Sequence, residues 1–334
     1  MNLTDLRRLV APLIALVLLV GGCASDTDRS EDVGDRAVAT GGPQFSTADE
    51  ETAKLGTTAK AGEFPRTITH ALGETTIKTK PKRVVVLDSG ELDHVLALGI
   101  KPVGLASADA TGGLPSYLED KIAGVDVIGT HTEINLEALA ALKPDLILGS
   151  KLRVAKLYDQ LSAIAPTVFS IRPGFPWKEN FLLAADALGK EEKAVDVLNE
   201  YQAKADEVGN SIKGDPTVSI VRFMSGKTRL YANLSFIGVI LNDIGLKRPA
   251  VEDVDDLAVE VSAENIKEVT GDWVFYSNYG AEEEQKTVLG GQLWSEIPAV
   301  ANGQSKAVND DTWFLGLGPV GAMSVLDDLE KIFT

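Results

Sequence analysis

The chain has 334 residues, 44% of them apolar, and its 32 Lys and Arg against 49 Asp and Glu give a net charge of −17. This composition is that of a folded protein long enough for two domains, and the charge argues against nucleic-acid binding, which needs clustered Lys and Arg. A single Cys excludes an internal disulfide, a zinc ribbon and an all-Cys iron–sulfur site, and three scattered His argue against a protein-bound transition-metal cage.

Residues 1–22 are predicted to be a signal peptide. Arg7 and Arg8 precede the apolar run 9–20, which is too short for a membrane-spanning helix of about 20 residues and has the length of a signal-peptide core. The run ends in Val20-Gly21-Gly22-Cys23. This ending resembles the lipobox of bacterial lipoproteins, although that motif usually has Leu where this chain has Val20. The resemblance implies cleavage before Cys23 and lipid attachment to it; the alternative is an ordinary secretory signal with an incidental Cys.

The next segment, 23–63, is predicted to be the acylated Cys followed by a disordered tether. Residues 24–63 contain nine acidic and four basic residues, and their only large apolar residues are Val33, Val38, Phe45 and Leu55. Such a segment buries too little surface to offset its conformational entropy. A tether of this kind lets a folded part move away from the membrane surface.

Residues 64–177 are predicted to form an N-terminal α/β lobe. Short apolar runs of strand length alternate there with helical patterns, and strands that are apolar on both faces indicate a parallel sheet covered on both sides. Asn135 is expected to cap a helix, with Glu137 in its first turn. The predicted strands are 83–87, 102–106, 125–128, 144–148 and 166–171, and the predicted helices are 91–98, 136–142 and 155–164.

A long helical pattern, 178–213, separates this lobe from a second one, 214–334. It contains no Pro, and Gly189 marks a bend or a break within it. In the second lobe the acidic run from Glu252 to Asp256 is expected to be a solvated surface. The predicted strands there are 218–223, 257–261, 273–276 and an edge strand 307–313, and the predicted helices are 236–244, 263–269, 293–300 and 320–333.

Several motifs in this order resemble the iron–siderophore and vitamin B12 binding proteins of bacterial ABC importers, over roughly residues 67–334. The motifs are PKRVVVL at 81–87, PVG at 102–104, NLEAL at 135–139, LKPDLIL at 142–148, VSAENI at 261–266 and LW at 293–294. The resemblance implies the class III periplasmic-binding-protein fold, in which two Rossmann-like lobes with mostly parallel sheets are joined by a single long backbone helix.

In open α/β sheets ligands bind outside the carboxyl ends of the strands, so the residues that follow the strands are candidates for the cleft. Arg and aromatic residues gather there in an otherwise acidic chain. A ferric siderophore already wraps its metal in oxygen ligands, so its binding protein needs cations and flat apolar faces rather than metal ligands. Each candidate also has a structural alternative as a turn, core or outward strand residue. The predicted ligand-binding set is Lys151, Arg153, Arg172, Trp177, Arg222, Tyr231, Tyr279 and Trp313.

The resemblance also implies partners. Relatives dock on a membrane permease through one glutamate on each lobe, and Glu137 and Glu264 match those places; alternatively, both are only favourable first-turn charges. We therefore expect a monomeric, lipid-anchored substrate-binding protein on the extracytoplasmic face of the cell membrane, serving an ABC permease and its ATPase. Little closure between the lobes is expected because a continuous helix resists hinging.

No enzyme is expected, since the sequence lacks a Gly-x-Ser-x-Gly motif, a phosphate loop and a His-Glu-x-x-His motif. No cofactor or protein-bound metal is expected, because the chelator holds the iron. Two alternatives stay open. The same scaffold binds cobalamin or haem, with His131 or Tyr279 near the metal, or the chain is an extracytoplasmic adaptor or enzyme.

Overall fold

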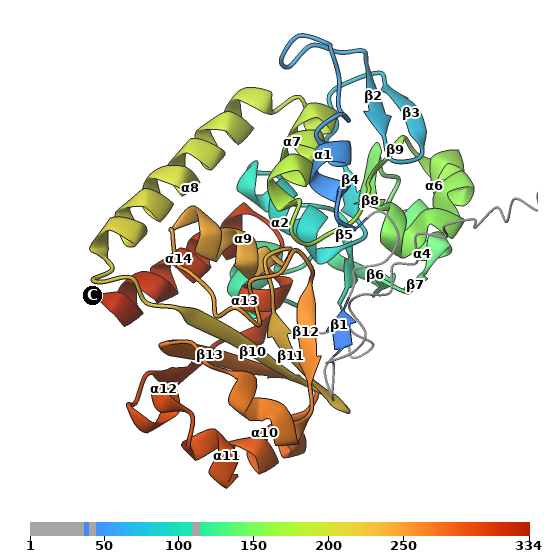
Figure 1. The fold of residues 1–334 in the computed structure, drawn as a ribbon. Helices are drawn as coiled ribbons and strands as arrows, with labels where there is room; N and C mark the ends of the chain where they lie inside the picture. The colour runs from blue at the N-terminus through green and yellow to red at the C-terminus, as the bar shows by residue number, and fades with distance from the viewer. Residues whose placement is uncertain (1–36, 40–44, 109–113) are drawn as a thin grey trace, which may run out of the picture. The chain divides into compact units, whose positions relative to one another are not determined.

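A computed structural model describes residues 37–39, for which only the backbone is described, together with 45–108 and 114–334 (Figure 1). Contacts divide the chain into Met1–Gly34 and Asp35–Thr334, and the fold below is that of the second unit. The predicted signal peptide and Cys23 lie outside the described residues. Within the described ranges, no helix combines the length and the apolar character that crossing a membrane requires.

The N-terminal lobe contains a six-stranded sheet in the order β7-β6-β5-β4-β8-β9, parallel except for the edge strand β7. Its central strands are buried on both faces: Val84 and Val86 point into one core, and Val85 and Leu87 into the other. The apolar runs therefore form strands at the predicted places. The strands are β4 (Val84–Val86), β5 (Gly104–Ser107), β6 (Asp126–Thr130), β7 (Glu133–Ile134), β8 (Leu146–Ser150) and β9 (Thr167–Ser170).

Helices cover both faces of this sheet, and a separate hairpin of β2 (Arg66–His70) and β3 (Gly73–Ile77) precedes it. Asn135 caps α4 as predicted, because its side-chain oxygen accepts a hydrogen bond from the N–H of Ala138 at 3.0 Å. The helices are α2 (Ser89–Ala97), η1 (Ser116–Leu118), α3 (Glu119–Ile122), α4 (Leu136–Ala141), α5 (Lys151–Val154), η2 (Ala155–Leu157) and α6 (Tyr158–Ile164).

The long helical pattern forms two helices, α7 (Trp177–Leu188) and the 21-residue α8 (Glu191–Ser211). Gly189 separates them with a left-handed backbone (φ 60°), and the N–H of Lys190 bonds back to the carbonyl of Ala185. A Cβ at Gly189 would also lie 2.7 Å from the Phe64 ring. The break between the two helices therefore requires glycine at position 189. Helix α8 then runs beside the last helix, α14 (Pro319–Phe333) (Figure 1).

The C-terminal lobe has a six-stranded sheet in the order β1-β12-β11-β10-β13-β14. Strands β10, β13 and β14 are parallel, whereas β10, β11, β12 and β1 pair antiparallel. The predicted α/β class with largely parallel sheets and a long helix is confirmed, with this antiparallel portion as a local departure. The strands are β1 (Ala37–Ala39), β10 (Val218–Met224), β11 (Lys227–Tyr231), β12 (Ala258–Val261), β13 (Trp273–Tyr279) and β14 (Ser305–Ala307).

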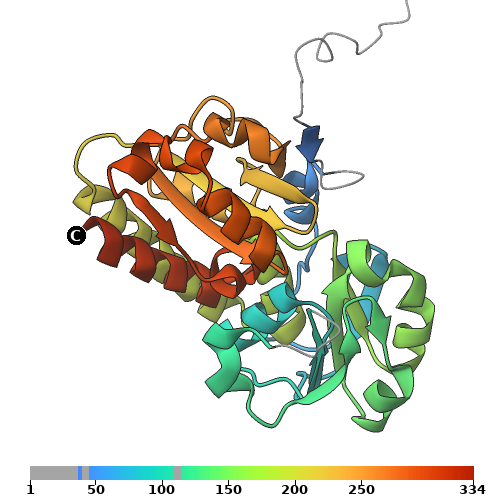
Figure 2. The same cartoon turned by 90° about the horizontal axis from the view of Figure 1, so that it is seen from below.

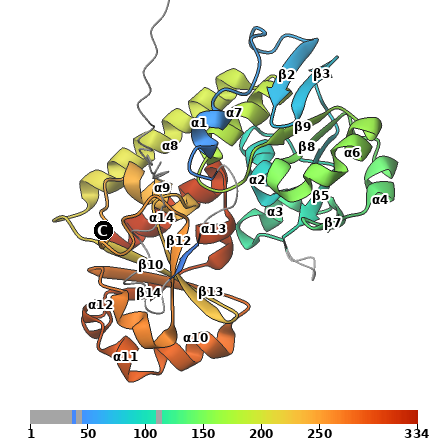
Figure 3. The same cartoon turned by 45° about the vertical axis from the view of Figure 1, so that its right-hand side comes forward.

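This sheet also lies between two layers of helices, as Figure 3 shows, and Figure 2 shows the same lobe from below. Helices α8, α9, α13 and α14 pack on one face, and η3, α10, α11 and α12 pack on the other. Further bounds are α9 (Phe236–Asp243), η3 (Ala263–Glu268), α10 (Glu282–Leu289), α11 (Gln292–Ser295), α12 (Pro298–Ala301) and α13 (Asp310–Leu315).

Two expectations need correction. The predicted edge strand 307–313 is wrong: β14 ends at Ala307, and Asn309 caps α13 by accepting from the N–H of Thr312. Residues 37–39 and 45–63 of the predicted disordered tether are folded, and β1 pairs with β12. Phe45 is buried, and helix α1 (Ala48–Thr52) contacts α7. The apolar partners that order this segment come from distant parts of the chain, so its own composition did not indicate them.

Candidate functional site

A cavity of about 410 Å³ opens between the two lobes at the carboxyl ends of their strands. In the N-terminal sheet the chain passes from β4 to β5 on one side and later returns to β8 on the other, which is the switch point where open α/β sheets bind ligands. The cavity is lined by Leu152, Arg153, Arg172, Pro173, Gly174, Arg222, Met224, Arg229, Tyr231, Phe236, Ile237, Leu257, Tyr279, Trp313, Phe314, Leu315 and Leu317.

The structure brings six of the eight predicted ligand-binding residues to this cavity. They are Arg153, Arg172, Arg222, Tyr231, Tyr279 and Trp313. The other two lie elsewhere. Lys151 begins α5 but is not part of the lining. Trp177 is fully buried, with its ring perpendicular to Tyr201 at 5.0 Å between centroids, so it is a core residue that joins α7 to α8.

Arg153 reaches the cavity from α5 and is anchored by a buried carboxylate. Its Nε donates to Asp88 Oδ2 at 3.2 Å, and Asp88 follows β4 as the N-cap of α2. Burial by itself raises the pKa of Asp88, but neighbouring His131 and Arg153 and the N–H of Ser89 outweigh it and hold that pKa below its usual value. His131 Nδ1 lies 3.9 Å from Asp88 Oδ1, so this histidine faces the anchor and is not part of the cavity lining.

Arg222 on β10 is held more tightly. Its guanidinium pairs with both carboxylate oxygens of Asp310, with Nε at 2.8 Å from Oδ1, and its Nη1 donates to the hydroxyl of Tyr231 at 3.1 Å. The hydroxyl of Ser277 donates to Asp310 Oδ1 at 2.7 Å. Although burial opposes the charged form, Asp310 raises the pKa of Arg222 above its usual value. Arg222 is therefore a permanent, oriented cation.

Arg229 on β11 also has a carboxylate partner. Its Nε and Nη2 donate to Glu260 Oε1 at 2.9 and 2.7 Å. Arg172, which follows β9, is held between aromatic rings. Its guanidinium carbon lies 4.3 Å from the Phe45 ring centroid and 5.9 Å from that of Phe175. Burial, with Arg153 nearby, lowers the pKa of Arg172 to about 10, so this residue stays charged at neutral pH.

The aromatic residues play unequal parts at the cavity. Tyr279 ends β13 and is 41% exposed, with its ring stacked on the Arg222 guanidinium at 4.6 Å. Tyr231 and Phe314 are buried and meet edge to face at 4.8 Å. Trp313 is fully buried, and its Nε1 donates to Asp328. Tyr279 is thus the aromatic side chain that offers a free face at the cavity mouth, whereas the others form its floor.

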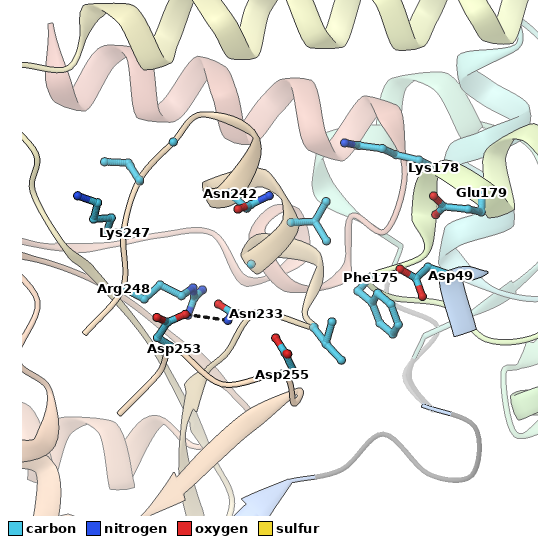
Figure 4. A pocket seen from close by; sticks show the side chains of 15 residues that line it. Asp49, Phe175, Lys178, Glu179, Asn233, Asn242, Lys247, Arg248, Asp253 and Asp255 are labelled. Carbon is cyan, nitrogen blue, oxygen red and sulfur yellow. Dashed lines mark hydrogen bonds between the residues drawn. The ribbon is translucent and has the colours of Figure 1, made fainter. Parts of the chain in front are cut away.

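A larger cavity of about 580 Å³ lies beside α9 and differs in charge (Figure 4). Four acidic side chains line it: Asp49, Glu179, Asp253 and Asp255. Its cations are paired with acids, since Lys178, Lys247 and Arg248 form ion pairs with Asp243, Asp215 and Glu252. This cavity has no surplus of positive charge for an anion. The candidate site is therefore the smaller cavity between the lobes.

Sequence reasoning missed the three carboxylates that anchor the arginines, namely Asp88, Asp310 and Glu260. Asp88 could have been found, because it follows the first strand just as the candidate arginines follow theirs. Four arginines and no carboxylate are among the described residues that line the cavity. Such a site suits an anion with several oxygen atoms and an apolar rim.

The two predicted docking glutamates are both exposed. Glu137 lies in the first turn of α4 and Glu264 in η3, so each lobe carries one of them.

Comparisons with known proteins agree with this geometry. The model of the family described as "Periplasmic binding protein" matches residues 84–312. The chain belongs to the periplasmic binding protein family. The matched residues include the parallel strands of both lobes and most of the residues that line the cavity between them.

Individual relatives extend this assignment. The chain is 38% identical to the probable siderophore-binding lipoprotein YfiY of Bacillus subtilis, over 80% of this chain and 87% of that one. It is 32% identical to the Fe(3+)-citrate-binding protein YfmC of the same organism, over 78% and 84%. Among solved structures, SirA of Staphylococcus aureus complexed with staphyloferrin B is 33% identical, with a TM-score of 0.72 over 80% of this chain and 97% of that one.

Proposed function

We propose that this protein is the substrate-binding lipoprotein of an ABC importer and captures a ferric siderophore in the cavity between its lobes. The observation that carries the proposal is the set of four arginines around one cavity, three of them oriented by buried or half-buried carboxylates. The named ligands of its relatives, a siderophore, ferric citrate and staphyloferrin B, support it.

The arginines favour an anionic ferric complex that carries carboxylates. A guanidinium presents a planar fork of donors that matches a carboxylate in two places, and Tyr279 offers a flat face for the chelator's apolar rim. The cobalamin or haem alternative would need a metal ligand at the cavity. His131 faces Asp88 instead, which leaves only Tyr279 of the two residues considered for that role.

The test is a titration of the purified protein by intrinsic fluorescence. Ferric citrate, a neutral ferric hydroxamate, a ferric catecholate, haem and cobalamin would be added in parallel. We expect quenching to saturate at the lowest concentration with an anionic ferric complex. Saturation by haem or cobalamin alone would favour the alternative ligand, and no saturable quenching by any of the five would refute the proposal.

Anchoring through Cys23 completes the proposed role, because a tethered binding protein stays near its permease. Replacing Cys23 by Ala should move the protein from the membrane fraction to the medium without changing its affinity for the ligand. Retention of a lipid label by the Cys23→Ala variant would contradict the anchor.

A further inference from the structure

The segment Phe45–Thr52 joins the two lobes beside the candidate site. Phe45, Ala48 and Phe175 form one buried apolar cluster. Ile171, which follows β9 of the N-terminal lobe, and Leu234, Val239 and Leu257 of the C-terminal lobe pack against that cluster. Helix α1 continues from it onto α7. Phe45 is therefore a buried residue at the junction of the lobes, 21 residues before β2 begins at Arg66.

Phe45 and Phe175 form part of the wall between the two cavities. Their rings meet at right angles, with centroids 5.3 Å apart and an interplanar angle of 77°. Arg172 and Leu257, on one side of this pair, line the cavity between the lobes. Phe175 and Asp49 line the larger cavity, and Figure 4 shows them next to each other at one end of it.

The face of Phe45 supports the guanidinium of Arg172. The guanidinium carbon lies 4.3 Å from the ring centroid, within the range of a cation–π contact. The rest of Arg172 is also fixed: its Nε donates to the carbonyl of Pro173 at 3.2 Å, and its own carbonyl accepts from Asn180 Nδ2 at 2.8 Å. The ring attracts the cation through its π face.

We infer that Phe45 is a positioning residue of the binding site, whose ring holds the Arg172 guanidinium in place for the anionic oxygens of the ligand. This inference rests on the proposed function. It makes a segment inside the predicted tether part of the ligand site, although Phe45 itself need not touch the ligand.

The test compares Phe45→Leu with Phe45→Trp and with a matched control. Leu keeps an apolar side chain but removes the π face, whereas Trp restores it. The control is Phe64→Leu, because the Phe64 ring makes the same kind of contact with Arg66, at 4.6 Å from the guanidinium carbon, and does not line the cavity. Affinity for ferric citrate and thermal stability would be measured for all three variants and the wild type.

We expect Phe45→Leu to weaken ferric citrate binding about 5- to 10-fold, the range for one partly desolvated cation–π contact. The affinity of Phe45→Trp for ferric citrate should be within about 2-fold of the wild-type affinity. Phe64→Leu should lower the melting temperature without weakening binding. Equal affinities of Phe45→Leu and wild type, or an equal loss in Phe64→Leu, would overturn the inference.

A second measurement needs no ligand and separates this inference from the proposed function. In the ligand-free protein the side-chain Nε–H resonance of Arg172, assigned with Arg172→Lys, should shift when Phe45→Leu removes the ring current, and Phe64→Leu should leave it in place. An unmoved resonance would overturn the positioning role whatever the ligand. If wild type binds none of the ferric complexes while the resonance moves, the proposed function fails and the Phe45–Arg172 contact stands.

Discussion

Arginine is suited to this cavity because its charge persists where burial would neutralise other cations. Arg222 is buried at the end of β10, yet Asp310 holds it charged, and Ser277 and Tyr231 fix the orientation of the pair. The carboxylate offsets much of the desolvation cost of the guanidinium, which lines the cavity. A lysine could not reproduce this fork of donors.

Replacing Arg222 by Met should therefore weaken binding of an anionic ferric complex by about 10-fold or more, which corresponds to about 1.4 kcal/mol. The melting temperature should also fall, because Asp310 loses its partner. Arg83→Met is the matched control, since Arg83 is exposed and bonds to the carbonyl of Leu142 far from the cavity lining. Fluorescence titration measures the ligand affinity of both variants. Equal affinities of Arg222→Met and Arg83→Met would contradict a role for Arg222 in binding.

At the scale of elements, a buried carboxylate connects α2 to α14. The carboxylate oxygens of Asp93 accept hydrogen bonds from the N–H groups of Val320 and Gly321, both at 2.8 Å, at the start of α14. The hydroxyl of Tyr117 lies 2.9 Å from Asp93 Oδ2. Asp93 thus caps the last helix of the chain from a helix of the other lobe, which restrains the lobes against each other.

This contact predicts a pH dependence of stability. Burial raises the pKa of Asp93 from 3.8 to about 7, although the hydrogen bonds from Val320 and Gly321 oppose the change. The folded protein therefore binds more protons than the unfolded chain between about pH 4 and pH 7, so the free energy of unfolding falls as pH rises through that window. Burial also raises the pKa of Glu91 to about 8 and that of Glu252 to about 7, which adds in the same direction. Burial lowers the pKa of His70 to about 4 and that of His94 to about 3, which opposes this trend below about pH 6.5.

The measurement is denaturant unfolding between pH 5 and pH 8 for wild type, Asp93→Asn and Asp126→Asn. Wild type should be more stable at pH 5 than at pH 8. The fall in the free energy of unfolding with pH should be smaller in Asp93→Asn, because the new side chain does not titrate. It should be unchanged in Asp126→Asn, because the side chain of Asp126 is exposed. The same slope in Asp93→Asn and wild type would show that Asp93 does not titrate in this range.

For the whole molecule, one exposed glutamate on each lobe is proposed to dock on the permease. If Glu137 and Glu264 pair with cations of the permease, Glu137→Arg and Glu264→Arg should each reduce iron uptake by cells several-fold, because a like charge replaces an attraction. Ligand affinity of the purified variants should not change, since neither residue lines the cavity.

Glu200→Arg supplies the control for this experiment. Glu200 is exposed on α8, a helix that does not contribute to the cavity lining, so its reversal changes the net charge equally. Uptake should stay near the wild-type rate in that variant. If all three reversals lower uptake alike, the effect comes from overall charge and the docking proposal fails.

Much of the fold could be predicted from local pattern. The runs around Val85 and Ile147 are buried on both faces in parallel strands, and Asn135 caps its helix as expected, because apolar alternation and capping depend on neighbouring residues. Residues 307–313, predicted to be one edge strand, contain the end of β14 and the start of α13. Glu252, expected on a solvated surface, is fully buried beside Arg248, where it accepts a hydrogen bond from the N–H of Ile220 at 3.0 Å.

The sequence by itself determined the class of the fold, the central parallel strands of the N-terminal sheet and the places after β8 and β9 where Arg153 and Arg172 lie. Strand-end position follows from hydrophobic pattern and from the rule that parallel strands end at one edge. Only the tertiary structure decided that Trp177 is core, that Asp88 and Asp310 hold the arginines, and that Phe45 reaches Arg172. Those outcomes depend on contacts between residues far apart in the chain, which burial and charge pairing select and local sequence does not encode.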